Sequence, residues 1–167
     1  ITTASDIRWT GTSQPVPRCT IDHTPDDGDT VQGAGIEFEV IHLAGHTRGG
    51  VAYLWDGHMF IGDTILPGGR IGWSDAHWGS NIPDHAESVN IVTSLANRAE
   101  RPPKRLYGGH GDPEDLTEAL LNEARNNVQK LDHVGLPSRV SERVPRRVST
   151  EAPTTIVVDG IPEESAM

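Results

Sequence analysis

Apolar and polar positions alternate where the chain first shows a regular pattern. Ile36, Phe38 and Val40 are separated by glutamates, and this period of two predicts a strand over residues 36–43 with one buried face. Residues 1–35 before it are rich in proline, threonine and acidic turn residues. We therefore expect loops there, with at most short strands.

A hairpin is predicted next. Two β-rich runs, 51–55 and 59–61, flank Asp56-Gly57-His58, and glycine in that place accepts the positive φ of a tight turn. Residues 66–80 are rich in glycine and contain Trp73, His77 and Trp78. They predict a long irregular loop. Its aromatic residues are candidates for a pocket wall, but packing over the sheet edge is the favoured alternative.

Two amphipathic helices follow, with a strand between them. Apolar residues recur every three or four positions from Ala86 to Ala99, Asp84 is placed to cap this helix, and Pro102-Pro103 ends it. Residues 104–107 predict a brief strand, and the same helical spacing predicts a second helix from about 115 to 131. The predicted order is β, ββ, α, β, α, which is an α/β domain.

One domain accounts for most of the chain. A length of 167 residues with 35% hydrophobic residues is enough for one ordinary core, and we assign residues 1–134 to it. Residues 135–167 form a C-terminal extension with a basic stretch, a candidate strand at 155–158 and an acidic end. We expect this extension to add an edge strand or to be partly disordered.

Charge and hydropathy exclude two classes of partner. The chain has 14 Lys and Arg against 24 Asp and Glu, a net charge of −10 without a basic patch, so nucleic-acid binding is not expected. No run approaches the ~20 apolar residues of a membrane span, so no membrane partner is expected. A single cysteine, Cys19, excludes an internal disulfide and fits a reducing compartment, so we expect a soluble, cytoplasmic protein.

Three polar residues each follow a predicted strand, directly after a glycine. His46 comes after the strand 36–43, Asp63 after the hairpin, and His110 after residues 104–107. If these strands share a sheet, their ends bring together two imidazoles and one carboxylate, which are donors that suit zinc, iron or manganese. Each residue alone is more often an ordinary turn residue, so the joint arrangement carries the hypothesis of a metal site.

The chain resembles the later half of the metallo-β-lactamase superfamily, and within it the glyoxalase II-like hydrolases. Three ordered motifs carry the resemblance: Ile41-His42-Leu43-Ala44-Gly45-His46-Thr47-Arg48-Gly49-Gly50, Phe60-Ile61-Gly62-Asp63-Thr64-Ile65-Leu66 and Leu106-Tyr107-Gly108-Gly109-His110-Gly111. The matched region runs from about Asp27 to Leu131. The resemblance implies an αββα sandwich, of which this chain holds mainly the C-terminal mixed sheet with its outer helices.

The resemblance also implies a role for each of the three residues. His46 would bind one metal ion and His110 a second, and Asp63 would bridge them, with two Zn²⁺ ions as the implied cofactor and iron or manganese as alternatives. The implied activity is hydrolysis of a small-molecule ester, thioester or lactone through a metal-bound hydroxide that Asp63 orients. By the same resemblance, the classical zinc β-lactamases have cysteine where Asp63 stands, which disfavours antibiotic hydrolysis. His42 and Ser88 match positions without a ligand or catalytic role.

The chain departs from the family at one point. The early motif His-x-His-x-Asp-His, which supplies most of the metal ligands, does not occur, and the sequence starts at Ile1 without an initiator methionine. We therefore expect the C-terminal half of a protein that is an enzyme at full length and inactive as this chain alone. Its open sheet face would meet the missing N-terminal half or cause self-association.

Two other functions remain open at this point. One is a metallo-β-lactamase-like domain without catalytic activity. The other is an acidic interaction domain in which the histidines are structural. The metal content of the full-length protein distinguishes the hydrolase from both.

Overall fold

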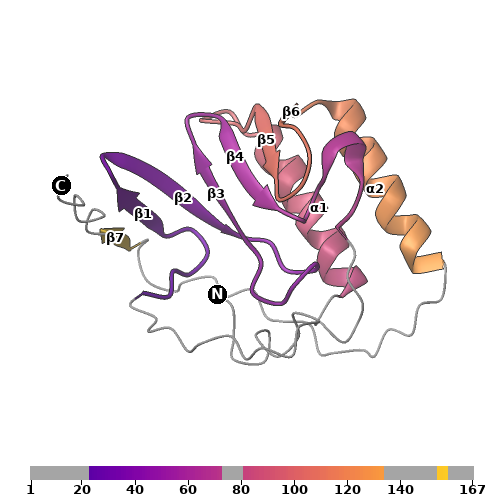
Figure 1. Cartoon of the computed structure of the whole chain (residues 1–167), viewed down its shortest axis with the longest axis horizontal. Helices are drawn as coiled ribbons and strands as arrows, with labels where there is room; N and C mark the ends of the chain where they lie inside the picture. The colour runs from indigo at the N-terminus through magenta and orange to yellow at the C-terminus, as the bar shows by residue number, and fades with distance from the viewer. Residues whose placement is uncertain (1–22, 73–80, 134–153, 158–167) are drawn as a thin grey trace, which may run out of the picture.

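The computed structural model describes residues 23–72, 81–133 and 154–157 (Figure 1). In these ranges seven strands form one mixed sheet in the order β6-β5-β4-β3-β2-β1-β7. The predicted α/β class is confirmed. The strands are β1 (Thr30–Gly33), β2 (Ile36–His42), β3 (Val51–Trp55), β4 (His58–Gly62), β5 (Arg105–Gly108), β6 (Glu114–Asp115) and β7 (Thr155–Val157).

The three strands that precede the candidate metal ligands run in the same direction. β2 is antiparallel to β3, β3 is antiparallel to β4, and β4 is parallel to β5. The C-terminal ends of β2, β4 and β5 therefore lie at one edge of the sheet. The metal-site hypothesis assumed this common edge.

The hairpin of β3 and β4 is confirmed in its position and its turn. Asp56 and Gly57 both have positive φ, 44° and 81°, which is the backbone of a type I′ turn. This turn matches the right-handed twist of the strands it joins. It fixes the register so that Leu54 pairs with Met59 and both reach the same face of the sheet.

Two helices cover one face of the sheet, α1 (Ile82–Ala96) and α2 (Glu118–His133), and a short 3-10 turn, η2 (Pro67–Gly69), precedes them. They lie side by side in Figure 1. The core fills the space between this face and the helices. Its buried strand residues are Ile41, Ala52, Leu54, Met59, Ile61 and Leu106, and its buried helix residues are Ile82, Val89, Val92, Leu120, Leu121, Ala124 and Val128.

Both helices start at residues other than those predicted. The cap of α1 is Asn81, whose side chain accepts a hydrogen bond from the Asp84 backbone N–H, so Asp84 lies inside the first turn. Proline at position 83 is compatible with this start because the first turn needs no N–H from it. Helix α2 begins at Glu118 and not at 115, because Glu114–Asp115 pairs with β5. The Thr117 hydroxyl, just before the helix, accepts a hydrogen bond from the Leu120 backbone N–H.

The opposite face of the sheet carries an aromatic cluster that we call the open face. Phe38, Tyr53, Trp55, Phe60 and Tyr107 belong to it, and Phe60 stacks on Tyr107 with ring centroids 4.8 Å apart. Phe38 on β2 belongs to this aromatic side of the sheet and not to the core under the helices. That side of the strand faces away from the helices, as expected for a surface that meets another part of the protein.

The remaining predictions divide between confirmed and untested. Thr155–Val157 forms an edge strand parallel to β1. This agrees with the expectation that the C-terminal extension adds an edge strand to the sheet. Trp73, His77 and Trp78 lie outside the described residues, and the boundary at 134 stays a prediction. In the described part of the chain, neither helix has the length and apolar character that crossing a membrane requires.

Candidate metal centre

Three loops at one edge of the sheet bring His46, Asp63 and His110 together. Asp63 follows β4 directly, His110 comes shortly after β5, and His46 lies a few residues beyond β2. The Nε2 atoms of both imidazoles lie 3.5 Å from the same carboxylate oxygen, Asp63 Oδ2. The three side chains thus converge as the strand ends suggested, while their role as ligands stays a prediction.

The centre opens toward solvent on the His110 side. The side chains of Asp63 and His46 are 21% and 27% exposed, whereas that of His110 is 76% exposed. Asp63 and His46 are therefore held by the surrounding protein. His110 is the member of the three that is most accessible to solvent.

The hydrogen bonding of His46 suits a metal ligand. Its Nδ1–H donates to the backbone carbonyl of Gly72, so in the neutral ring Nε2 carries a lone pair on the side of Asp63. A lone pair and a carboxylate repel one another unless a cation lies near both. Metal-binding histidines commonly donate their other N–H to a carbonyl in this way, which fixes the tautomer and the ring orientation.

The spacing of the donor atoms also fits. Two donors bonded at 2.0–2.2 Å to one tetrahedral ion lie about 3.3–3.6 Å apart. Each imidazole nitrogen is 3.5 Å from Asp63 Oδ2, so each is placed to share an ion with this oxygen. If each imidazole held its own ion, Asp63 Oδ2 would be the oxygen that both ions share.

These three residues do not complete a metal site. Across 23–72, 81–133 and 154–157, no group of three or more His, Cys, Asp or Glu side chains is arranged to hold a metal ion by itself. If Asp63 is shared, each ion receives only one imidazole and one carboxylate oxygen. A catalytic zinc ion usually has three protein ligands, so further donors are needed.

The backbone packs closely around Asp63. The Gly72 N–H donates to the Asp63 carbonyl at 3.0 Å, and the Gly109 N–H donates to the Gly62 carbonyl at 2.9 Å. A Cβ atom at Gly109 would lie 2.3 Å from Asp63 Oδ1. Only glycine at 109 lets the carboxylate keep this position.

Sequence reasoning missed His85, which lies behind the centre on α1. The residue is 1% exposed, and its Nε2–H donates to the Thr64 carbonyl at 2.6 Å. Desolvation by burial holds the pKa of His85 below its usual value of 6.5, which favours the neutral ring. Its spacing from Val89 and Val92 on the helical stripe was the signal that could have placed it inside.

Ser88 and His42 make structural contacts. The Ser88 hydroxyl is buried and donates to the Ala44 carbonyl at 2.5 Å, which ties α1 to the loop of His46. The His42 ring lies 3.2 Å from the Arg48 carbonyl, to which its Nε2–H donates. That neither residue has a ligand or catalytic role stays a prediction.

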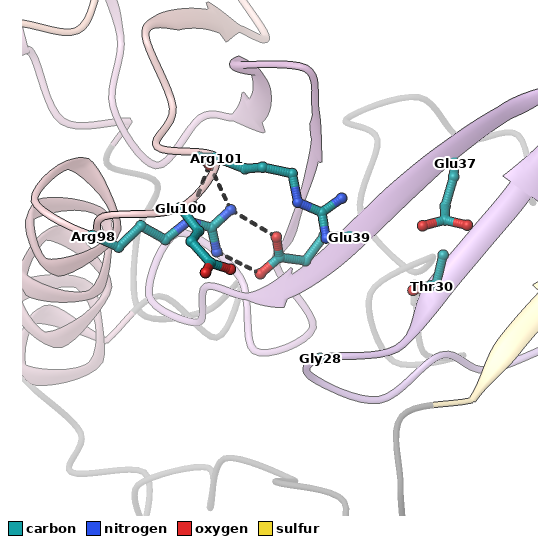
Figure 2. A pocket seen from close by; sticks show the side chains of 7 residues that line it. All are labelled: Gly28, Thr30, Glu37, Glu39, Arg98, Glu100 and Arg101. Carbon is teal, nitrogen blue, oxygen red and sulfur yellow. Dashed lines mark hydrogen bonds and ion pairs between the residues drawn. The ribbon is translucent and has the colours of Figure 1, made fainter.

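A separate polar cavity of about 410 Å³ is lined by residues of β1, β2 and the segment between α1 and β5, and none of the three candidate ligands lines it (Figure 2). Figure 2 shows Glu39 and Arg98 facing each other on its wall, where two hydrogen bonds of 2.8 Å join them. Arg98 also donates to the Arg101 carbonyl. This ion pair keeps the pKa of Arg98 above its usual value and ties β2 to the end of α1.

The fold is that of the metallo-β-lactamases. The chain resembles a metallo-β-lactamase from Pontibacter korlensis with a TM-score of 0.52 and 20% identity, covering 67% of this chain and 50% of that one. It resembles the BLEG-1 B3 metallo-β-lactamase with the same TM-score and identity, covering 76% and 56%. No protein-family profile matches the chain.

Sequence relatives narrow the class. The chain is 46% identical over 130 residues to a hydroxyacylglutathione hydrolase of Halorhodospira halophila, covering 75% of this chain and 51% of the relative. It is 55% identical over 118 residues to one of Xanthomonas campestris, covering 66% and 44%. A probable polyketide biosynthesis zinc-dependent hydrolase of Bacillus velezensis is 32% identical over 113 residues, covering 65% and 47%.

This chain is therefore a metallo-β-lactamase superfamily member related to the hydroxyacylglutathione hydrolases, and the resemblance seen in its motifs is confirmed. The chain spans about half the length of these relatives.

Proposed function

We propose that the protein containing this chain is a metal-dependent hydrolase that cleaves a small-molecule thioester. The observation that supports this most is the approach of the His46 and His110 Nε2 atoms to one Asp63 oxygen, both at 3.5 Å. His46 and His110 would each hold one of two divalent ions, and Asp63 would bridge them. Zinc is the first candidate, with iron or manganese as alternatives.

When bound, two such ions polarise a substrate carbonyl and lower the pKa of a coordinated water toward ~7. The residues of this chain place and orient the reacting groups. His46, held by the Gly72 carbonyl, presents Nε2 in one fixed direction. Asp63 would supply the shared negative charge, and its carboxylate would accept a hydrogen bond from a water molecule and so orient it.

The names of the relatives and the residue at position 63 support the proposed substrate class. Hydroxyacylglutathione is an acyl thioester of glutathione, and this name is shared by relatives up to 55% identical to the chain. Carboxylate at 63 disfavours the lactam hydrolysis of the zinc β-lactamases. Among the ester, thioester and lactone expected from the motifs, the thioester is therefore favoured.

The full-length protein is the right material for the test, because the described residues hold no group of three or more His, Cys, Asp or Glu side chains that could bind a metal ion. Metal content would be measured by mass spectrometry after zinc loading, and turnover with an acyl-glutathione thioester. Asp63→Asn removes the bridging charge, so we expect lower metal stoichiometry and loss of turnover with the fold intact. Asp115→Asn makes the same chemical change at an exposed carboxylate on β6 and serves as the control.

Two results would contradict the proposal. One is a wild-type protein that binds no metal and shows no thioesterase activity. The other is an Asp63→Asn variant with the metal content and turnover of the wild type, which would make Gly62-Asp63-Thr64 an ordinary turn.

A further inference from the structure

We propose that His85 is a positioning residue, whose buried imidazole joins the loop of Asp63 to the helix that also holds the loop of His46. This inference rests on the proposed function, since the relative position of the two loops matters most if they share a metal ion. It adds a residue on α1 that neither the motifs nor the relatives assign.

The first contact is with the loop of Asp63. His85 Nε2–H donates to the carbonyl of Thr64, the residue after Asp63, at 2.6 Å. Both partners are buried, with 1% exposure for His85 and 4% for Thr64. A hydrogen bond at this depth is shielded from water, so no solvent molecule replaces it without cost when it is removed.

The second contact is with the loop of His46. The residue before His46, Gly45, packs so closely on α1 that a Cβ there would lie 2.4 Å from His85 Cα. The Asn81 N–H donates to the Gly45 carbonyl at 2.8 Å at the start of the same helix. The backbone of α1 thus holds one loop, and the His85 side chain reaches from this point to the other.

The other ring nitrogen makes His85 a costly residue for packing alone. His85 Nδ1 is buried without a hydrogen-bond partner, and no other buried side-chain atom of the described residues shares this condition. Burial also holds the pKa of the ring low, so this nitrogen is an unpaired acceptor. Burying an acceptor without a hydrogen-bond partner costs free energy, and an apolar side chain at position 85 would avoid this cost. The presence of histidine there therefore calls for an explanation other than packing.

The test compares three variants of the full-length protein. His85→Leu removes the donor to Thr64, His85→Gln keeps an amide donor at similar reach, and Val92→Ala removes buried volume from the same helix away from both loops. Zinc affinity would be measured by competition with a chelator. Exchange of the Gly72 and Gly109 amide hydrogens, which bond to Asp63 and Gly62, would be followed in metal-free protein.

We expect His85→Leu to weaken zinc binding by about 10–100-fold, the range for residues that orient metal ligands. Both amides should exchange roughly tenfold faster, as the loss of one buried hydrogen bond predicts. His85→Gln should lie nearer to wild type in both measurements, and Val92→Ala should lower stability without this loss of affinity. If His85→Leu does not fold, His85→Asn, whose shorter amide does not reach Thr64, replaces it.

The inference is overturned if His85→Leu keeps wild-type exchange rates, or if Val92→Ala weakens zinc binding as much as His85→Leu does. A wild-type protein that binds no zinc contradicts the proposed function instead. In that case the exchange rates of metal-free protein still decide the role of His85, because faster exchange supports the link between the loops and unchanged exchange refutes it.

Discussion

Replacing Gly109 with alanine should separate metal binding from folding. Gly109 lies in the loop after β5, and its α carbon faces the Asp63 carboxylate. The new Cβ would lie 2.3 Å from Asp63 Oδ1, whereas an ordinary contact begins at about 3.4 Å. The oxygen therefore has to withdraw by about 1.1 Å, the difference between these two distances.

This displacement is large for a metal ligand and small for the fold. Ligand distances are held within about 0.2 Å, and a misplacement of ~1 Å at a reacting centre costs on the order of 100-fold. A side chain forced off its rotamer costs about 0.5–1.5 kcal/mol, and alanine for glycine restores about 0.4–1 kcal/mol through the unfolded chain. We expect zinc affinity to fall roughly 100-fold and the free energy of unfolding to change by less than ~1 kcal/mol.

The neighbouring glycine provides a matched control. A Cβ at Gly108 would meet its nearest atoms at 3.4 Å, which is ordinary contact, and Asp63 is not among them. Both variants of the full-length protein would be compared by chelator competition and by denaturant unfolding. Wild-type zinc affinity in Gly109→Ala, or an equal loss in Gly108→Ala, would refute the reasoning from the Asp63 contact.

Further predictions concern pH, metal stoichiometry and association. Below pH 6.5 the unfolded chain takes up a proton at His85 that the folded protein resists, so the free energy of unfolding should fall with decreasing pH, by at most about 1.4 kcal/mol per unit. Urea unfolding should show a shallower decline in His85→Gln, and parallel curves would contradict this. His110→Ala should lower the zinc stoichiometry from two toward one, because His46 and Asp63 remain, and an unchanged count would exclude His110 as a ligand. Residues 1–167 alone should self-associate through the open face, where Phe60 and Trp55 are 40% and 39% exposed, and should show no turnover even with added zinc. Sedimentation velocity tests this, and a monodisperse, active preparation would contradict it.

Local pattern was enough for most of the elements. The period of two around Phe38, the Asp56-Gly57 turn and the spacing of Val89 and Val92 each reflect interactions between residues close in sequence, so they are readable without the fold. The starts of the helices could not be predicted from local pattern. Asn81 and Asp84 are both good capping residues, and which of them caps α1 depends on how the whole first turn is placed. The short strand Glu114–Asp115 could not be predicted either, because it forms only by pairing with β5.

For the candidate site, the sequence supplied the residue types and their order, with His46, Asp63 and His110 each placed after a strand. It could not show that β2, β4 and β5 run in the same direction, since strand direction depends on pairings between distant segments. It also could not show that His85 lies beneath the centre, because a histidine on an apolar stripe has no partner until the helix docks. The sequence alone determined which donors are present, and the tertiary structure decided which of them meet, because convergence depends on contacts between residues far apart in the chain.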